Sequence, residues 1–276
     1  MSAPLLDTRA PAPATTGRTP SQPVTVRRAI ASEWIKFRTL RSTWATLGSA
    51  VVGMLILGLI VAYNTRDLSS NLQPDDIAPS STLQGYNLSQ LLIGALGVLF
   101  VSGEYSTGMI RATLAAVPKR LPVLWAKLAV FVAVTATCMI VISFVTFLSA
   151  QGLLSHYRPG YSLSDPGALR VVLGTGIYLT LIGVIGGILA WIIRSTPGAL
   201  VAYFGVVLLL PLIFGELLGN WGKNVDKFLP ASAGARFAES IPEGYSLTPW
   251  WALAVLIAWV LIGLGVSAVL LRRRDA

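Results

Sequence analysis

Six apolar runs, each long enough to cross a membrane as an α-helix, constrain this chain more than any other feature of its sequence. An α-helix rises about 1.5 Å per residue, so about 20 residues cross the roughly 30 Å hydrocarbon layer of a bilayer. Charged residues make up only 12% of the chain, against about 25% in a typical soluble domain. The sequence therefore predicts an all-α integral membrane protein with six transmembrane helices, at about residues 45–63, 86–102, 123–150, 169–192, 198–218 and 250–271.

The distribution of basic residues predicts the orientation. Most of the 21 Lys and Arg residues lie before the first span, between the second and third spans, and after the last span. Cytoplasmic loops are enriched in Lys and Arg, so we expect both termini in the cytoplasm. The net charge of +9 belongs to these span ends and not to one face of a folded domain. We therefore expect no nucleic-acid partner.

The segments outside the spans divide the chain further. Residues 1–24 are rich in Pro, Ala and Thr, which predicts a disordered cytoplasmic tail. Residues 25–44 alternate bulky apolar and basic residues near helical spacing, which predicts an amphipathic helix at the inner leaflet. Its apolar positions are Ile30, Trp34, Phe37 and Trp44. The spans form one transmembrane domain over residues 45–271, and residues 272–276 form a basic cytoplasmic tail.

Two spans carry packing signals. The spacing of Gly183 and Gly187 in the fourth span lets another helix approach its backbone closely. Packing within the chain is the expected explanation, and a dimer seam is the alternative. Pro211 removes a backbone hydrogen bond from the fifth span, which predicts a kink there.

Ionisable residues are almost absent from the spans. Lys127 lies one turn into the third span, where we expect it to snorkel to the cytoplasmic interface, and Glu104 and Glu216 lie at span ends. An ion-coupled carrier keeps carboxylates or histidines near mid-membrane, so the pattern disfavours a self-powered secondary transporter. The single cysteine, Cys138, and the single histidine, His156, predict neither a disulfide nor a metal site.

No nucleotide-binding motif is present either. The sequence contains no phosphate-binding GxxxxGK[ST] loop and no dinucleotide-binding GxGxxG turn. We expect no catalytic residue, no bound cofactor and no enzymatic activity in this chain. If it moves a solute uphill, the energy comes from another protein.

A patterned polar insert, "GEYSTGMIRATLAAVPKR", separates the second and third spans at residues 103–120. Ser106 or Thr107 can cap a helix that Pro118 ends, so we predict a short amphipathic helix at about residues 106–117 on the cytoplasmic surface. Such a helix either shields the membrane edge or acts as a lever on which a partner pushes.

Three stretches together resemble the membrane subunit of type-2 ABC transporters, most closely the stand-alone permeases of actinobacterial type. They are "SEWIKFRTLRSTW", "SGEYSTGMIRATLAAVPKR" and "FLPASAGARF". The resemblance implies that the first is a connecting helix, with its family positions at Glu33, Trp34, Lys36, Phe37 and Arg38. It implies that the second is the coupling helix that docks on the ATPase, with its positions at Glu104, Tyr105, Thr107, Arg111, Pro118 and Arg120. It also implies a partly re-entrant outer loop at about residues 219–249.

The resemblance implies a function as well. The chain would be the permease subunit of an ABC exporter in the bacterial cytoplasmic membrane, paired with a second copy or a paralogue. A separate ATPase subunit would bind ATP and Mg²⁺, and the cargo would be a hydrophobic or amphiphilic compound such as a drug, an antibiotic or a lipid-like molecule. Glu104 is the best single candidate for the coupling contact, because a carboxylate at the membrane surface can hold the basic insert or a basic group of the partner.

Two other functions remain open from the sequence. One is a membrane scaffold or immunity protein that binds a partner without transporting anything. The other is a membrane enzyme that processes lipids, which needs polar side chains converging at one depth. Tyr161, His156 and Asp165, in one outer loop, are the least implausible such cluster.

Overall fold

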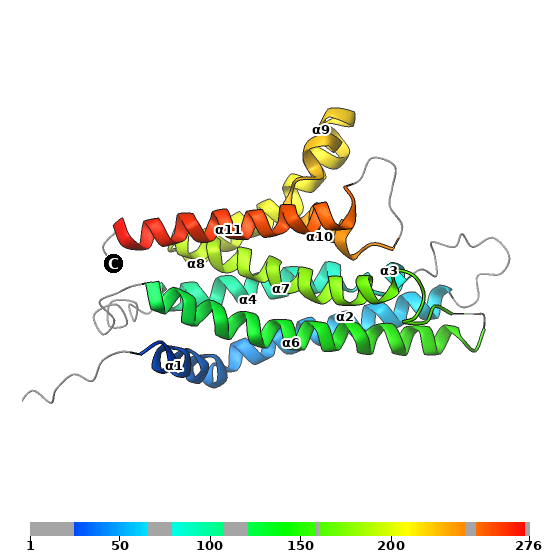
Figure 1. Cartoon of the computed structure of the whole chain (residues 1–276), viewed down its shortest axis with the longest axis horizontal. Coiled ribbons are helices and arrows are strands. Elements are labelled where there is room, and N and C mark those ends of the chain that lie inside the picture. Colours follow the sequence, from blue (N-terminus) through cyan, green and yellow to red (C-terminus); the bar gives the residue numbers. More distant parts are fainter. Residues whose placement is uncertain (1–24, 66–78, 107–120, 158–159, 241–246, 274–276) are drawn as a thin grey trace, which may run out of the picture.

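The computed structural model describes residues 25–65, 79–106, 121–157, 160–240 and 247–273. All regular structure in these residues is helical, and six helical stretches are long and apolar enough to cross a membrane. This confirms the six predicted spans. They are α2 (Arg41–Thr65), α4 (Tyr86–Ser106), α6 (Leu121–Leu154), α7 (Ala168–Ile193), the fifth span beginning with α8 (Thr196–Phe204), and α11 (Pro249–Arg273). In Figure 1, α2, α4, α6, α7 and α11 run roughly along the long axis of the molecule, and the fifth span leaves the bundle toward α9.

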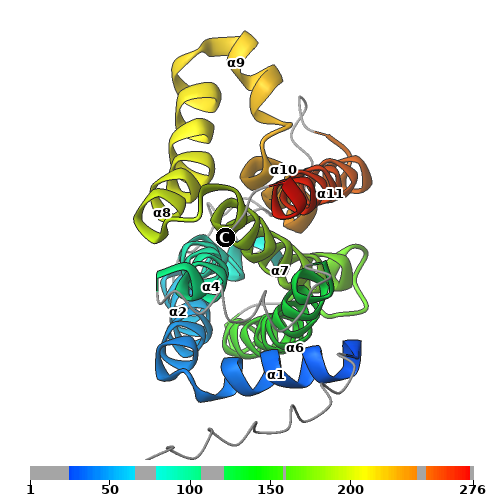
Figure 2. The ribbon, with the colours of Figure 1, turned by 90° about the vertical axis from the view of Figure 1, so that its left-hand side faces the viewer.

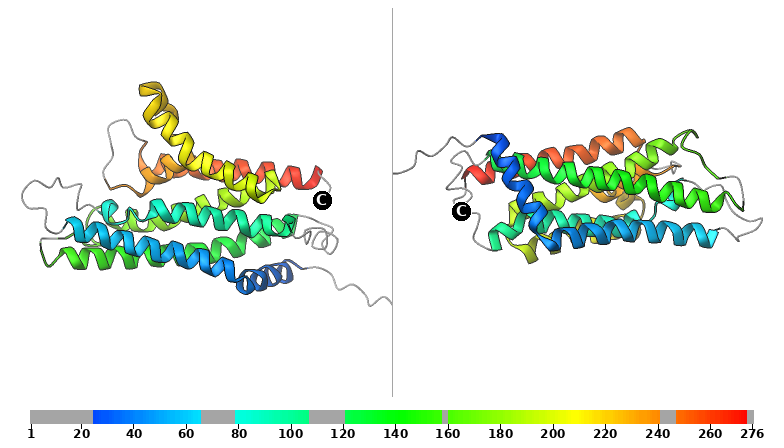
Figure 3. Two further views of the ribbon diagram at one scale, coloured as in Figure 1. Left: turned by 180° about the vertical axis from the view of Figure 1, so that it is seen from behind. Right: turned by 90° about the horizontal axis from the view of Figure 1, so that it is seen from below.

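The amphipathic segment before the first span forms α1 (Val26–Thr39). Thr25 caps it, because the Thr25 hydroxyl accepts a hydrogen bond from the Arg28 amide at 3.4 Å. Leu40 adopts an extended conformation that ends α1, so residues 41–44 of the predicted amphipathic segment belong to α2. Helix α1 lies across the end of the bundle and packs against α6 (Figures 2 and 3).

Helix α7 is the centre of the bundle, because 72% of its most apolar 18-residue segment is buried. Its most extensive contact is with α4, and in that contact glycines of one helix pack against glycines of the other. A Cβ added at Gly97 would meet the backbone of Gly183, and one added at Gly186 would meet the backbone of Gly94. The small residues at positions 183 and 187 therefore serve packing within the chain, as expected.

The fifth span has an irregular backbone. After α8 it continues in two π-helical stretches, Gly205–Leu209 and Leu212–Leu217, which lie on either side of Pro211. Proline lacks the amide hydrogen that an α-helix needs at that position, and wider turns are one way for a helix to accommodate such a defect. The predicted distortion at Pro211 thus takes the form of π-turns. This span is also the least covered of the six, because only 17% of its most apolar 18-residue segment is buried.

Three short helices complete the described chain. Helix α3 (Pro79–Thr82) precedes α4, and α9 (Gly219–Asp226) lies away from the bundle after the fifth span (Figure 1). Helix α10 (Pro230–Ala238) returns to pack between α7 and α11. The Arg170 guanidinium holds its end, donating to the backbone oxygens of Phe237 at 2.8 Å and Glu239 at 2.9 Å. Helices α9 and α10 occupy the region for which the resemblance implies a re-entrant loop.

A bulkier residue at the contact between α4 and α7 should weaken the bundle. We expect Gly97→Val to lower the free energy of unfolding by about 1–3 kcal/mol, because the added side chain forces the two helices apart. Unfolding of the purified protein by SDS in mixed micelles, followed by circular dichroism, measures this change. The control is Gly265→Val on α11, where an added Cβ has nothing within 4 Å. Equal stability of the two variants would contradict the packing described here.

Candidate functional site

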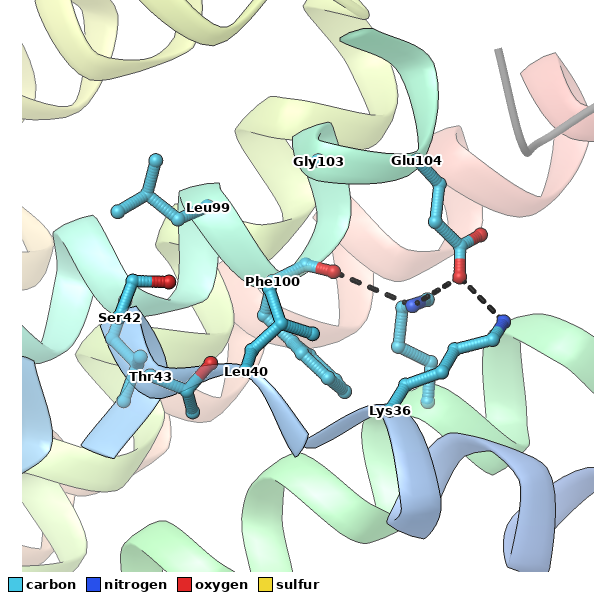
Figure 4. Close-up of a pocket in the computed structure, with 10 residues that line it drawn as sticks. Lys36, Leu40, Ser42, Thr43, Leu99, Phe100, Gly103 and Glu104 are labelled. Atoms are coloured by element: carbon cyan, nitrogen blue, oxygen red, sulfur yellow. Dashed lines mark hydrogen bonds and ion pairs between the residues drawn. The ribbon is translucent and has the colours of Figure 1, made fainter. Parts of the chain in front are cut away.

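Four charged side chains from three helices meet at the end of the bundle that α1 covers. Glu33 and Lys36 come from α1, Glu104 from α4 and Lys127 from α6. The Lys36 Nζ lies 2.6 Å from Glu33 Oε1 and 2.6 Å from Glu104 Oε1. The Lys127 Nζ lies 2.7 Å from Glu33 Oε2 and 3.0 Å from Glu104 Oε1. The two cations and two anions thus alternate around a closed ring, which we call the charge cluster; Figure 4 shows the contact between Lys36 and Glu104.

The helical spacing of α1 delivers two members of the cluster together. Glu33 and Lys36 are three residues apart, so both project from the same face of the helix. Phe37 on that face is fully buried and meets the ring of Phe100 edge-on, with 5.2 Å between centroids. Phe37 therefore anchors α1 on the bundle, directly beside the charges. Of the apolar positions seen in the sequence, Ile30 and Trp34 are exposed and only Phe37 faces inward.

Burial makes the pairing of these charges essential. The side chains of Glu33, Lys127 and Glu104 are only 2%, 4% and 7% exposed. Removing a charge from water costs several kcal/mol, which only close partners offset. The Lys127 ammonium faces three acceptors, the two carboxylates and the Phe100 carbonyl oxygen at 3.3 Å, and it also lies 4.4 Å from the Phe100 ring centroid. The Lys127 ammonium is therefore held by partners inside the chain, and its position at the cytoplasmic interface stays a prediction.

Lys36 is the one member of the cluster that keeps contact with the surroundings, with a side chain 23% exposed. Partial burial lowers the pKa of Lys36, but the hydrogen bonds and charges of Glu104 and Glu33 outweigh it and raise the pKa above the ordinary 10.5. The ammonium contributes its full stabilisation below the ordinary pKa and loses it only as the pH rises through the elevated value. The Lys36 ammonium accordingly stays charged throughout the physiological pH range.

Glu104 pairs with two lysines of its own chain, and its coupling contact with the insert or with a partner stays a prediction. Its Oε1 accepts hydrogen bonds from Lys36 and Lys127, so the carboxylate joins three helices of its own chain. Its Oε2 is buried and has no hydrogen-bond partner in the described part of the chain. The structure thus gives Glu104 an intramolecular role at the root of the segment that follows α4.

The other predicted positions fall in three groups. Tyr105 lies beneath the Arg194 guanidinium, with 5.7 Å between Cζ and the ring centroid. Trp34 and Arg38 are exposed on α1, and the Arg38 carbonyl oxygen accepts a hydrogen bond from Trp44 at 3.0 Å. The remaining positions lie outside the described residues, together with most of the predicted coupling helix at 106–117, which stays a prediction. They are Thr107, Arg111, Pro118 and Arg120.

Sequence reasoning missed that Glu33, Lys36 and Lys127 form one site with Glu104. A usable signal was present, because a lone lysine inside an apolar span needs a partner. Glu104, at the end of the preceding span, was the available carboxylate. The pairing with Glu33 has no comparable signal, since the two residues are far apart in the sequence.

In the outer loop considered for lipid chemistry, the three candidate residues contact other residues of the chain. His156 Nδ1 lies 3.0 Å from the Gly152 carbonyl oxygen, and Asp165 Oδ2 accepts from the Ser162 amide at 2.6 Å. The Tyr161 amide donates to Gln151 at 2.9 Å. The hydrogen bonds of the described residues thus do not join His156, Asp165 and Tyr161 to one another. Within the described ranges, no group of three or more His, Cys, Asp or Glu residues is placed to hold a metal ion.

Comparison with known proteins shows that the charge cluster lies in a region that matches a protein family. A family model described as "ABC-2 family transporter protein" matches residues 29–204, which is more than half of the chain. The matched region runs from α1 to α8 and contains all four members of the cluster. A search of the curated proteins found no match to this chain.

Breaking the charge cluster from one side should be strongly destabilising. In Lys127→Met, two buried carboxylates share the one remaining ammonium, and we expect a loss of about 3–5 kcal/mol in the free energy of unfolding. Adding Glu33→Gln to this variant removes one uncompensated charge and should recover part of the loss. Unfolding in SDS mixed micelles measures both effects. Lys223→Met, at an exposed position of α9, is the matched control, and a Lys127→Met protein as stable as this control would refute the ring of charges.

Proposed function

The chain belongs to the ABC-2 family of transporter proteins, and from this premise we propose that it is the permease subunit of an ABC exporter whose energy comes from a separate ATPase. A member of this family works in general with an ABC ATPase. The ATPase would bind ATP and Mg²⁺, and this chain would supply the membrane path without catalysing a reaction itself. It would lie in a bacterial cytoplasmic membrane with both termini inside.

The observation that carries the proposal is the position of the charge cluster. It joins α1 to the last turns of α4 and the first turns of α6, which are the two spans on either side of residues 107–120. A force applied by the ATPase to that segment or to α1 therefore reaches the same ion pairs. The cluster would make α1, α4 and α6 move together.

The ionisable groups of the spans also support an external energy source. In the described spans they lie near the ends, such as Glu104 and Lys127 at one end of the bundle and Arg170 and Glu216 toward the other. A coupling ion would have to be bound near mid-membrane. The proposed cycle instead exchanges inward-open and outward-open states according to the nucleotide state of the ATPase.

The apolar character of the spans supports a hydrophobic or amphiphilic cargo, such as a drug, an antibiotic or a lipid-like molecule. A second permease copy or a paralogue would complete the path. The fifth span supports this assembly, because it is the least covered of the six and leaves large apolar side chains exposed. The most exposed of them are Val201 at 73% and Leu217 at 71%.

Loss of the Glu104 charge should uncouple the permease from its ATPase. We expect Glu104→Gln to lower cargo-stimulated ATP hydrolysis of the reconstituted complex about tenfold, a typical size for coupling between two sites. Arg111→Ala should have the same direction of effect if residues 106–117 form the coupling helix. Lys223→Gln, at an exposed position of α9, should leave hydrolysis unchanged. Unaltered coupling in both test variants, or accumulation of cargo by the purified chain without any ATPase, would refute the proposal.

The proposed orientation can be tested with a single cysteine. In a Cys138→Ala background, Ser164→Cys in the outer loop should react with a membrane-impermeant maleimide on intact cells, because that loop faces outward. Ser32→Cys on α1 should react only after the membrane is permeabilised. Both serines are exposed, so accessibility within the fold does not limit labelling. Labelling of Ser32→Cys on intact cells would reverse the orientation.

A further inference from the structure

A pocket of about 250 Å³ lies beside the charge cluster, between the junction of α1 with α2 and the last turns of α4. Its wall is mainly apolar, with a charged end. The residues that matter here are Leu40, Leu96, Leu99, Phe100, Gly103 and Lys36 (Figure 4). The volume is near the lower end of small-molecule sites, about 300–1,000 Å³, so the pocket takes one hydrocarbon chain and not a whole large molecule.

Lys36 leaves one hydrogen-bond donor for a ligand at the charged end. An ammonium group carries three N–H donors. The Lys36 ammonium donates to Glu33 and to Glu104, and no third acceptor occurs in the described part of the chain. Lys127 differs, because it faces three acceptors already and is buried. The group that completes Lys36 must therefore be an acceptor that reaches its 23% exposed side chain.

The charges around the pocket favour an anion. Among the lining residues are two ammonium groups, Lys36 and Lys127, and one carboxylate, Glu104. Glu33 makes the charge cluster as a whole neutral, so the excess positive charge at this end comes from Arg38 and Arg41. Arg38 and Arg41 flank Leu40 in the chain, are exposed, and form no ion pair with another described residue. An acidic group at this end thus meets a net positive surface.

The apolar part of the pocket opens toward the membrane and not toward water alone. Leu40 and Leu99 on its wall are 48% and 40% exposed. Trp34 on α1 and Trp44 at the start of α2 are also exposed, at 43% and 44%, and exposed tryptophans mark the membrane–water interface. The pocket therefore lies at the level where the head groups of the inner leaflet meet their acyl chains.

We propose that this pocket binds an anionic phospholipid of the inner leaflet. Its phosphate accepts the third hydrogen bond of Lys36 near Arg38 and Arg41, and one acyl chain fills the space beside Leu96, Leu99 and Phe100. The lipid would then contact both α1 and α4 beside the charge cluster. Binding of this lipid does not depend on the transport function, so either proposal can fail alone.

Gly103 offers a way to close the pocket. It lines the pocket, and a Cβ built there has no atom of the described residues within 4 Å. Gly103→Leu should therefore place its side chain where the acyl chain lies. Gly265→Leu on α11, also with nothing within 4 Å of the added Cβ, is the matched control. Leu99→Trp fills the same space from the exposed side of α4 and replaces Gly103→Leu if that variant fails to fold.

The test is native mass spectrometry of the full chain in detergent with dioleoylphosphatidylglycerol or dioleoylphosphatidylcholine. We expect one tightly held phosphatidylglycerol, and binding about tenfold weaker in Gly103→Leu, the effect of excluding about two buried methylene groups. Gly265→Leu should bind as the wild type does. Arg41→Gln should reduce the preference for phosphatidylglycerol over phosphatidylcholine about fivefold, the effect of one basic residue near an anionic surface.

Three results would overturn the proposal. They are equal binding of the two lipids by the wild type, undiminished binding by both pocket-filling variants, and displacement of the lipid by a molar excess of inorganic phosphate. The last would show that the charged end binds a free anion without help from the apolar wall. All measurements are made without the ATPase, so they leave the transport proposal untouched.

Discussion

Ion pairing between two buried carboxylates and two ammonium groups is the constraint on which one end of this molecule depends. Glu33, Glu104 and Lys127 are almost fully buried, and each would be costly alone. Together with Lys36 they form a neutral ring, and that ring requires α1, α4 and α6 to meet at one place. The amphipathic helix before the first span is therefore part of the bundle. One face of this helix holds it there, through the charges of Glu33 and Lys36 and through the contact of Phe37 with Phe100.

Helix α4 transmits this constraint into the membrane. At its C-terminal end Glu104 joins the ring of charges, and farther along Gly94 and Gly97 lie against the backbone of α7. Close backbone packing leaves little room for α4 to slide on α7, because every displacement meets main-chain atoms. A push on α1 would therefore move α4 and α7 as one body. The fifth span packs less tightly and would adjust to that movement.

The sequence was sufficient for the six spans because hydrophobic length alone determines whether a segment can cross a bilayer. It also located the amphipathic helix before the first span, but not which of its residues point inward. Ile30, Trp34 and Phe37 look equivalent by periodicity, and only the contact with Phe100 distinguishes Phe37. The charge cluster could be predicted in part, since Lys127 needed a partner. Its union with Glu33 depends on how α1 crosses α6, which no local pattern encodes.

The π-helical stretches around Pro211 bear on how the fifth span presents its side chains. A π-turn accommodates one residue more than an α-turn, and each residue of a helix turns the chain by about 100°. Conversion of the turn at Gly205–Leu209 between π-helical and α-helical geometry would rotate the following residues, up to Leu217, about the helix axis. The direction of the axis would stay the same. The rotation of this span about its own axis thus determines which of its side chains face a neighbour. That rotation depends on which backbone carbonyls accept π-helical and which accept α-helical hydrogen bonds.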